Sequence, residues 1–270
     1  MSWAVLVPFA IAFAPVVLDM ASIWLNDGDR AYGAVVPLFA VYLAWERRDA
    51  AREQIDDGSW LALPLLLAGL GLLIFGTLVA SSTLRSLSLP VTFIGMTAFH
   101  LGWSTAKVLA TPLAFLFLMV PVPHYLYIAV AFPLQQLAAS LAAGALETLG
   151  VVVFLEGNVL HLPHAALGVN EACSGIRSLF SLVVLALAWG TVSFTAATPT
   201  LLLAASAVPI SVLTNGGRVV ASGLTGRWFG REVANGAAHD LAGWVVFLAA
   251  LLGLAAVHAL LRRFFSERKS

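Results

Sequence analysis

The chain has 270 residues, of which 60% are hydrophobic and only 10% are charged, and its mean hydropathy is +0.94. This composition excludes an ordinary soluble domain, and a formal net charge of +0 argues against a nucleic-acid partner. The single cysteine excludes an internal disulfide framework and a multi-cysteine zinc site. We therefore interpret the chain as an all-α integral membrane protein that has the lipid bilayer as a partner.

Apolar windows of roughly 20 residues, the length that crosses the hydrocarbon core, follow one another along the chain. The first lacks the basic start and the small-residue cleavage site of a signal peptide, so we expect it to remain as a span. About eight transmembrane helices are predicted, at 3–25, 31–45, 60–80, 87–104, 106–122, 175–196, 198–220 and 241–261.

Segment 126–149 is also apolar, but it contains a proline, two glutamines and a glutamate. Basic residues follow the second window and the last one, and the positive-inside rule places both groups in the cytoplasm. The windows counted from the two ends then agree only if 123–173 stays on the outer side. We therefore predict an outer-face cap at 123–173, in which 126–149 is an interfacial helix.

The second half of this cap carries polar residues that are costly in lipid, among them Glu156 and Asn158. An alternative in which 126–149 spans and 151–168 returns would bury these side chains in the bilayer. The β-branched run at 151–153, followed by the turn residues of "EGN", is typical of a short β-hairpin instead.

Three residues with complementary chemistry stand at the outer ends of the last three windows. Cys173 precedes the sixth window, where the positive end of a helix dipole lowers the pKa of a thiol and favours the reactive thiolate. Arg218 ends the seventh window, and its permanent charge suits it to hold an oxyanion. His239 begins the eighth, and imidazole transfers protons near neutral pH.

Each of these residues alone has a common structural explanation: a core thiol, a snorkelling arginine, and a histidine beside a helix cap. Their coincidence at one depth favours a catalytic set. Neighbouring polar residues either orient the site, bind substrate or cap helices, and these are Asn170, Glu171, Arg177, Asn215 and Asp240.

Four stretches together resemble the exosortase/archaeosortase family. They are "FLEGNVLHLPHAALGVNEACSGIRSL" (154–179), "TNGGRV" (214–219), "AHDLAGW" (238–244) and "RAYGAVVPLFAVYLAWERR" (30–48). The likeness covers nearly the whole chain, so it implies a single domain over 1–270. One departure is visible, because the family's early tyrosine–glycine span usually carries a histidine and "AYGAVVP" has none.

The resemblance implies a cysteine protease or transpeptidase in the bacterial cytoplasmic membrane, with its site on the outer, periplasmic side and both termini in the cytoplasm. Its substrates would be exported proteins that end in a short motif such as Pro-Glu-Pro, one transmembrane helix and a basic tail. Cys173 would be the nucleophile, Arg218 the transition-state stabiliser and His239 the general acid and base, with no cofactor and no metal.

Two other classes remain as alternatives. A non-enzymatic transporter or scaffold would carry charges deep in its spans or paired interrupted helices, and the sequence has little of either. A zinc-dependent membrane protease would use His161 and His164 with Cys173 and His239, but the "HLPH" spacing is a weak ligand pattern.

Overall fold

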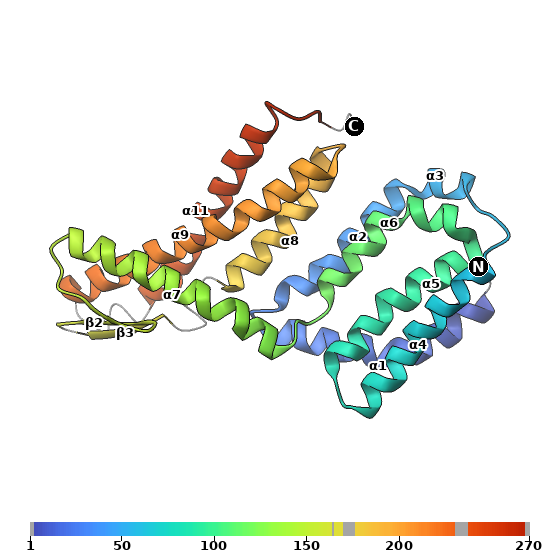
Figure 1. Ribbon diagram of the computed structural model, residues 1–270, viewed down its shortest axis with the longest axis horizontal. Coiled ribbons are helices and arrows are strands. Elements are labelled where there is room, and N and C mark those ends of the chain that lie inside the picture. Colours follow the sequence, from blue (N-terminus) through green and yellow to red (C-terminus); the bar gives the residue numbers. More distant parts are fainter. Residues whose placement is uncertain (1–2, 164, 170–175, 230–236, 268–270) are drawn as a thin grey trace. The chain divides into compact units, whose positions relative to one another are not determined.

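The computed structural model describes residues 3–163, 165–169, 176–229 and 237–267, and most of them are helical. The chain forms two compact units, Met1–Pro123 and His124–Ser270 (Figure 1). Each unit has its own helix packing.

Unit 1 contains the first five predicted windows, all as helices. Its elements are α1 (Trp3–Asn26), η1 (Ala31–Ala34), α2 (Val35–Glu46), α3 (Arg48–Glu53), η2 (Trp60–Ala62), α4 (Leu63–Leu78), α5 (Ser82–Val108), α6 (Ala110–Phe115) and η3 (Leu116–Met119). Helix α5 is kinked at Gly102, whose φ of 86° lies in the region that glycine adopts without strain.

Helices α4 and α5 form an antiparallel hairpin that depends on small residues. A Cβ placed on Gly95 of α5 would lie 2.6 Å from the backbone nitrogen of Leu66 on α4. A Cβ on Gly69 of α4 would likewise lie 2.6 Å from the backbone nitrogen of Thr92 on α5. The two backbones therefore come closer than larger side chains would allow, as is common between membrane helices.

Two long-range hydrogen bonds show which helix ends of unit 1 lie next to each other. Arg47 donates a hydrogen bond to the carbonyl oxygen of Val108 at 3.2 Å, which joins the end of α2 to the end of α5. At the start of α5, the Thr83 hydroxyl donates to the carbonyl oxygen of Pro121 at 3.1 Å. The end of α2 therefore lies beside the end of α5, and Pro121 lies beside the start of α5.

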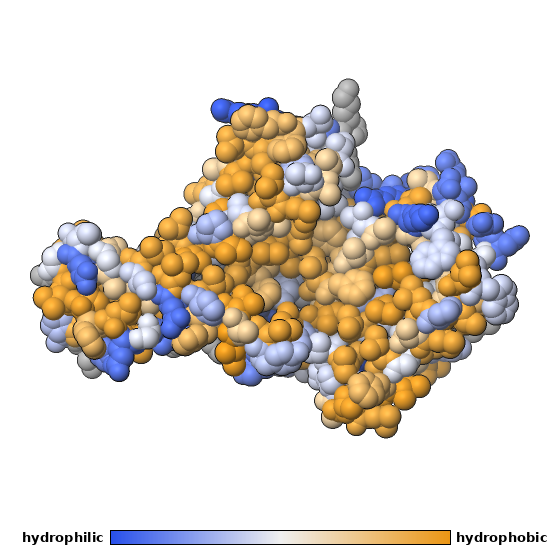
Figure 2. Space-filling view, in the orientation of Figure 1, coloured by the Kyte–Doolittle hydropathy of each residue, from blue (hydrophilic) through white to orange (hydrophobic). Residues whose placement is uncertain are grey.

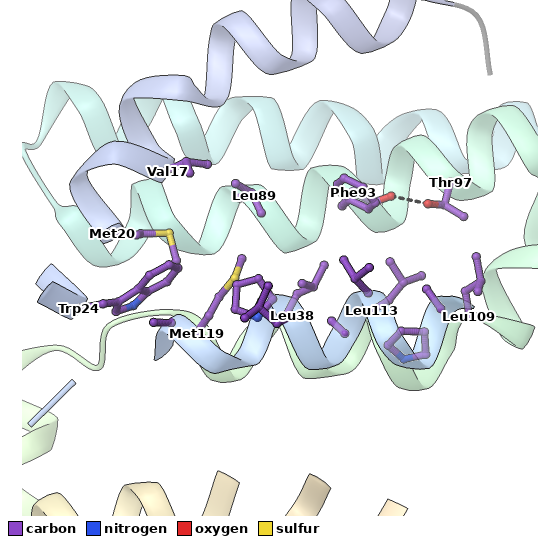
Figure 3. A pocket seen from close by; sticks show the side chains of 17 residues that line it. Val17, Met20, Trp24, Leu38, Leu89, Phe93, Thr97, Leu109, Leu113 and Met119 are labelled. Carbon is purple, nitrogen blue, oxygen red and sulfur yellow. Dashed lines mark hydrogen bonds between the residues drawn. The ribbon is translucent and has the colours of Figure 1, made fainter. Parts of the chain in front are cut away.

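A pocket of about 500 Å³ lies among α1, α2, α5 and α6 in unit 1 (Figure 3). Its lining is apolar apart from Thr97, whose hydroxyl already donates to the carbonyl oxygen of Phe93 at 2.8 Å. The pocket thus offers no catalytic group.

The described residues of unit 2 form α7 (His124–Thr148), three strands and three further helices. The strands are β1 (Phe154–Glu156), β2 (Val159–Leu162) and β3 (Ala165–Gly168), and the helices are α8 (Ile176–Ser193), α9 (Ala197–Phe229) and α11 (Ala237–Leu261). The strands pair antiparallel in the order β1-β2-β3. The predicted hairpin is therefore present, and a third strand extends it.

The number of membrane spans differs from the sequence prediction. Among the described residues, five helices are long and apolar enough to cross a membrane, or six if α5 and the helix Ala110–Met119, which meet at a bend of 99°, count as one span. Figure 2 shows apolar side chains over much of the visible surface, as expected for a multi-pass membrane protein. The predicted count of eight is not reached. The windows at 31–45 and 175–196 form shorter helices, the windows at 87–104 and 106–122 fall in the bent pair, and α7, which was not counted, is among the five.

Helix α7 was expected to lie in the membrane interface, yet its 25 residues meet the length and hydropathy criteria for a span. Pro133 lies within the helix without ending it. Gln135 is 6% exposed and accepts a hydrogen bond from Asn158, so its amide oxygen is satisfied inside the protein. These two residues therefore do not prevent α7 from being a span.

Candidate active site

Helices α8, α9 and α11 pack as antiparallel neighbours. A Cβ on Gly190 of α8 would lie 2.8 Å from the Cα of Thr200 near the start of α9. At the same end, the rings of Phe194 and His258 are 5.3 Å apart, which places the end of α8 beside the end of α11. The opposite end of unit 2 therefore gathers the start of α8, the second half of α9 and the start of α11.

Arg218 reaches from α9 to α11 at this end. A Cβ on Gly243 would lie 3.8 Å from Nη2 of Arg218, so the guanidinium packs against the backbone of α11. Arg218 is half-buried. His239 lies four residues before Gly243 on the same helix, and positions four apart share one helix face. The structure thus places Arg218 one turn of α11 from His239.

Asn215 lies three residues before Arg218 on α9 and is 2% exposed. Gly216 and Gly223 bring α9 close to α7, since a Cβ on Gly216 would lie 3.7 Å from the carbonyl oxygen of Ala138. Gly223 faces Leu146 further along both helices, so α7 and α9 run parallel.

The sheet covers the pair formed by α7 and α9. A buried cluster joins all three parts and contains Ala139, Ala142, Ala143, Leu146, Val151, Leu160, Leu162, Val169 and Val219. Val219 directly follows Arg218, and Val169 lies four residues before Cys173. The same buried cluster therefore contains the residue next to Arg218 and the last described residue before Cys173.

A set of hydrogen bonds that the sequence did not indicate holds Val169. Its backbone N–H donates to the carbonyl oxygen of Asn158 at 2.8 Å, and its carbonyl oxygen accepts from Asn158 Nδ2 at 2.9 Å. The same Nδ2 donates to Gln135 Oε1 on α7 at 3.3 Å. The hairpin turn that presents Asn158 requires Gly157, whose φ is 62°.

Several predicted site residues fall outside the described part of the chain. These are Asn170, Glu171 and Cys173. Arg177 lies at the start of α8, and His239 and Asp240 lie in the first turn of α11, but their side chains are outside the described part. The structure therefore brings Arg218 to α11 at Gly243, one turn from the helix position of His239, and it does not test the cysteine.

No group of three or more histidine, cysteine, aspartate or glutamate residues that could hold a metal ion occurs among the described residues. His161 Nε2 lies 3.3 Å from Glu156 Oε2 on the exposed side of the hairpin. This contact engages the histidine within the sheet.

Comparison with protein families gives one match, to the family described as transmembrane exosortase (Exosortase_EpsH), over residues 24–256. No curated protein and no solved structure matches the chain. The family match runs from the end of α1 into α11, so it includes the sheet, the cysteine segment, Arg218 and His239. The chain therefore belongs to the transmembrane exosortase family.

Proposed function

We propose that this exosortase is a membrane-embedded cysteine transpeptidase or protease. Its substrates are exported proteins that carry a C-terminal sorting signal, made of a short motif such as Pro-Glu-Pro, one transmembrane helix and a basic tail. Cleavage passes through a thioester between the substrate and Cys173. The whole chain, 1–270, acts as one functional domain, and segment 123–173 forms the cap beside the site.

The contact between Arg218 and Gly243 carries this proposal. It sets a permanently charged guanidinium one helical turn from His239, at the same end of unit 2 as the start of α8. Cys173 precedes that start by three residues. A nucleophile, a proton carrier and an oxyanion donor are the three parts that acyl transfer by a thiol needs.

In the first half of the reaction, His239 takes the thiol proton of Cys173 and the sulfur attacks the scissile carbonyl carbon. A C–S bond forms, and the carbonyl oxygen becomes an oxyanion that Arg218 stabilises with its fork of N–H donors. When the tetrahedral intermediate collapses, the C–N bond breaks, and the imidazolium of His239 gives its proton to the leaving amine.

In the second half, an incoming amine or water attacks the thioester carbonyl carbon. His239, now neutral, accepts the proton of this nucleophile, and Arg218 again holds the oxyanion. The C–S bond then breaks, and the sulfur takes the proton from the imidazolium of His239, which restores the thiol of Cys173 and the neutral imidazole. Arg177 binds the acidic residue of the sorting motif, and Asn170, Glu171, Asn215 and Asp240 orient the site.

The site lies on the outer side of the cytoplasmic membrane, with both termini in the cytoplasm. This arrangement suits the substrate, since an exported protein presents the residues just before its transmembrane helix on that side. It also places Arg47, Arg48 and Arg52 in the cytoplasm, as the positive-inside rule favours.

The proposal is tested by co-expressing an exported reporter that carries the complete sorting signal with wild-type enzyme or with Cys173→Ala. We expect the wild type to shorten the reporter, as followed by immunoblot, and Cys173→Ala to leave it at full length. A covalent complex that hydroxylamine releases should appear with the wild type only. Arg218→Gln and His239→Ala should then each slow processing strongly.

Processing that continues unchanged in Cys173→Ala cells would overturn the thiol mechanism. Arg52→Gln is the matched control for Arg218→Gln, because it removes an exposed arginine from α3, outside the site. It should leave processing at the wild-type rate.

A further inference from the structure

We infer that the outer edge of β3 is the docking strand for the substrate, and that the extended segment before the substrate's transmembrane helix pairs with it as a fourth strand. This inference rests on the proposed function, because it needs a polypeptide substrate. It adds the surface that would recognise the substrate backbone and aim the scissile bond at Cys173.

The register of β2 and β3 determines which backbone groups face this edge. Val169 donates its N–H to the carbonyl oxygen of Asn158, so these two residues form a hydrogen-bonded pair. Bonded and non-bonded pairs alternate in an antiparallel ladder. The pairs of Gly168 with Val159 and of Ala166 with His161 are therefore non-bonded, and the N–H and C=O groups of Ala166 and Gly168 point away from β2.

This edge is accessible in the described part of the chain. Ala166 and Gly168 are both exposed, and a Cβ on Gly168 would meet no atom within 4 Å. Leu167 and Val169 alternate with them and pack into the buried cluster beneath the sheet. One face of β3 is therefore anchored on the core, while its outward backbone groups pair with no described strand.

The sequence of β3 does nothing to protect this edge. Edge strands usually carry a charge, a proline or a bulge that prevents another chain from pairing with them. β3 is "AALG", with small side chains that leave room for an incoming backbone. The opposite edge differs, because β1 has only three residues and ends in Glu156, which pairs with His161.

The position of β3 matches what a cysteine peptidase requires. A peptide bond inside a helix has its carbonyl oxygen engaged in a hydrogen bond, so a scissile bond is presented in extended chain. Pairing with a sheet edge holds a peptide extended through its main chain and leaves alternate side chains for recognition. β3 ends at Gly168, five residues before Cys173. A strand added to β3 would therefore lie beside the last described residues before the nucleophile in the sequence.

Disulfide trapping tests the pairing directly, since Cys173 is the only cysteine of the chain. Ala166→Cys and Gly168→Cys are each made in a Cys173→Ala background. They are co-expressed with reporters that carry single cysteines along the segment before the transmembrane helix. Paired strands lie about 4.8 Å apart, which is within the Cα separation that a disulfide spans. We expect the best-trapped reporter position to move by two residues between the two variants.

Trapping at the same reporter position with both variants, or with neither, would overturn the inference. So would stronger trapping by Phe154→Cys in the same background, because Phe154 is exposed on β1, the strand at the other edge of the sheet.

A proline pair tests the contribution of the edge to processing. Ala166→Pro removes an outward N–H and obstructs the edge, while every ladder bond to β2 remains. Leu155→Pro removes the outward N–H of β1, and because the Leu155 side chain packs against the buried cluster, Leu155→Ala controls for the loss of that side chain. We expect Ala166→Pro to slow processing about tenfold, the scale of one lost hydrogen bond, and Leu155→Pro to leave it unchanged. Both should keep the alkylation rate of Cys173 by a small maleimide, which shows that the thiol site is intact.

The two hypotheses fail in different ways. Processing that does not need Cys173 would refute the proposed function. Processing that needs Cys173 but is equally fast in Ala166→Pro and Leu155→Pro would refute only the edge inference. If Ala166→Pro lowers the alkylation rate as well, the trapping result decides.

Discussion

Gly243 leaves the space that the Arg218 guanidinium occupies beside α11. A Cβ there would lie 3.8 Å from Nη2, an ordinary van der Waals distance, so Gly243→Ala should be tolerated. Gly243→Leu would fill the space and displace the charge from the oxyanion position. We expect it to lower processing on the order of a hundredfold, the scale of one lost oxyanion donor.

Gly217→Leu is the matched control for this prediction. Gly217 adjoins Arg218 on α9, but it is exposed, and a Cβ on it would meet nothing within 4 Å. Its substitution should leave the rate of reporter processing unchanged. Equal rates for Gly243→Leu and the wild type would show that the position of the guanidinium does not matter.

Asn158 carries the hydrogen bonds that hold Val169 and Gln135. Asn158→Ala removes both side-chain donors and leaves the amide oxygen of the buried Gln135 unsatisfied, which should cost about 1–3 kcal/mol of stability. We expect a lower melting temperature in detergent and a changed alkylation rate of Cys173. Gln136→Ala, at an exposed neighbouring glutamine, should alter neither quantity.

For single residues, the sequence predicted which side chains have the right chemistry for a site better than it predicted which residues touch one another. Arg218 was identified by residue type and family resemblance, and Asn215 as its neighbour. The predicted window ended at 220, whereas α9 continues to Phe229, so both residues lie within the second half of the helix and not at its end. Asn158 was recognised only as costly in lipid. Its partners lie 11 and 23 residues away in the chain, so the contacts depend on the sheet register and on how α7 packs, which no local pattern contains.

The packing of α8 against α9 sets the distance between the start of α8 and Arg218. Gly190→Leu would drive a side chain into the backbone at Thr200, where a Cβ alone would already come within 2.8 Å of the Cα. We expect a loss of about 1–3 kcal/mol, measured as a lower melting temperature in detergent. Gly144→Leu on α7 is the control, since a Cβ there would meet no atom within 4 Å.

Apolar windows predicted where most of the helices lie. A helix that faces lipid needs a long run of apolar residues, and such a run is visible in the sequence itself. The third strand escaped prediction for the opposite reason. "AALG" has low β propensity, and β3 exists because Leu167 packs into the buried cluster and because β2 provides a ladder. Helix α7 was assigned to the interface because both groups of basic residues were placed in the cytoplasm. Its polar residues had made the segment ambiguous, and the sequence could not show that Gln135 is satisfied by Asn158.

Across the whole molecule, the contacts within each unit constrain the sides on which the helix ends lie. In unit 1, Pro121 lies at the end opposite to Arg47 and Val108. In unit 2, the start of α8 lies at the end opposite to Phe194 and the tail. Suppose that the basic residues after α2 and those of the tail are all cytoplasmic. Pro121 and the cysteine segment are then both outside, and α7 begins and ends on the same side of the membrane. If α7 crosses, one basic group must lie outside.

Cysteine labelling distinguishes these two topologies. Tyr125→Cys and Leu149→Cys, made singly in a Cys173→Ala background, place exposed thiols near the two ends of α7, where the native side chains are 71% and 58% exposed. Lys107→Cys reports the end of unit 1 that holds Arg47 and Val108, and Phe264→Cys reports the basic tail. Because the positive-inside rule favours cytoplasmic arginine and lysine, we expect a membrane-impermeant maleimide to label 125 and 149 on intact spheroplasts, and to label 107 and 264 only after permeabilisation. Labelling of 125 and 149 from opposite sides would show instead that α7 crosses the membrane, and the accessible basic end would then identify which half of the chain is inverted.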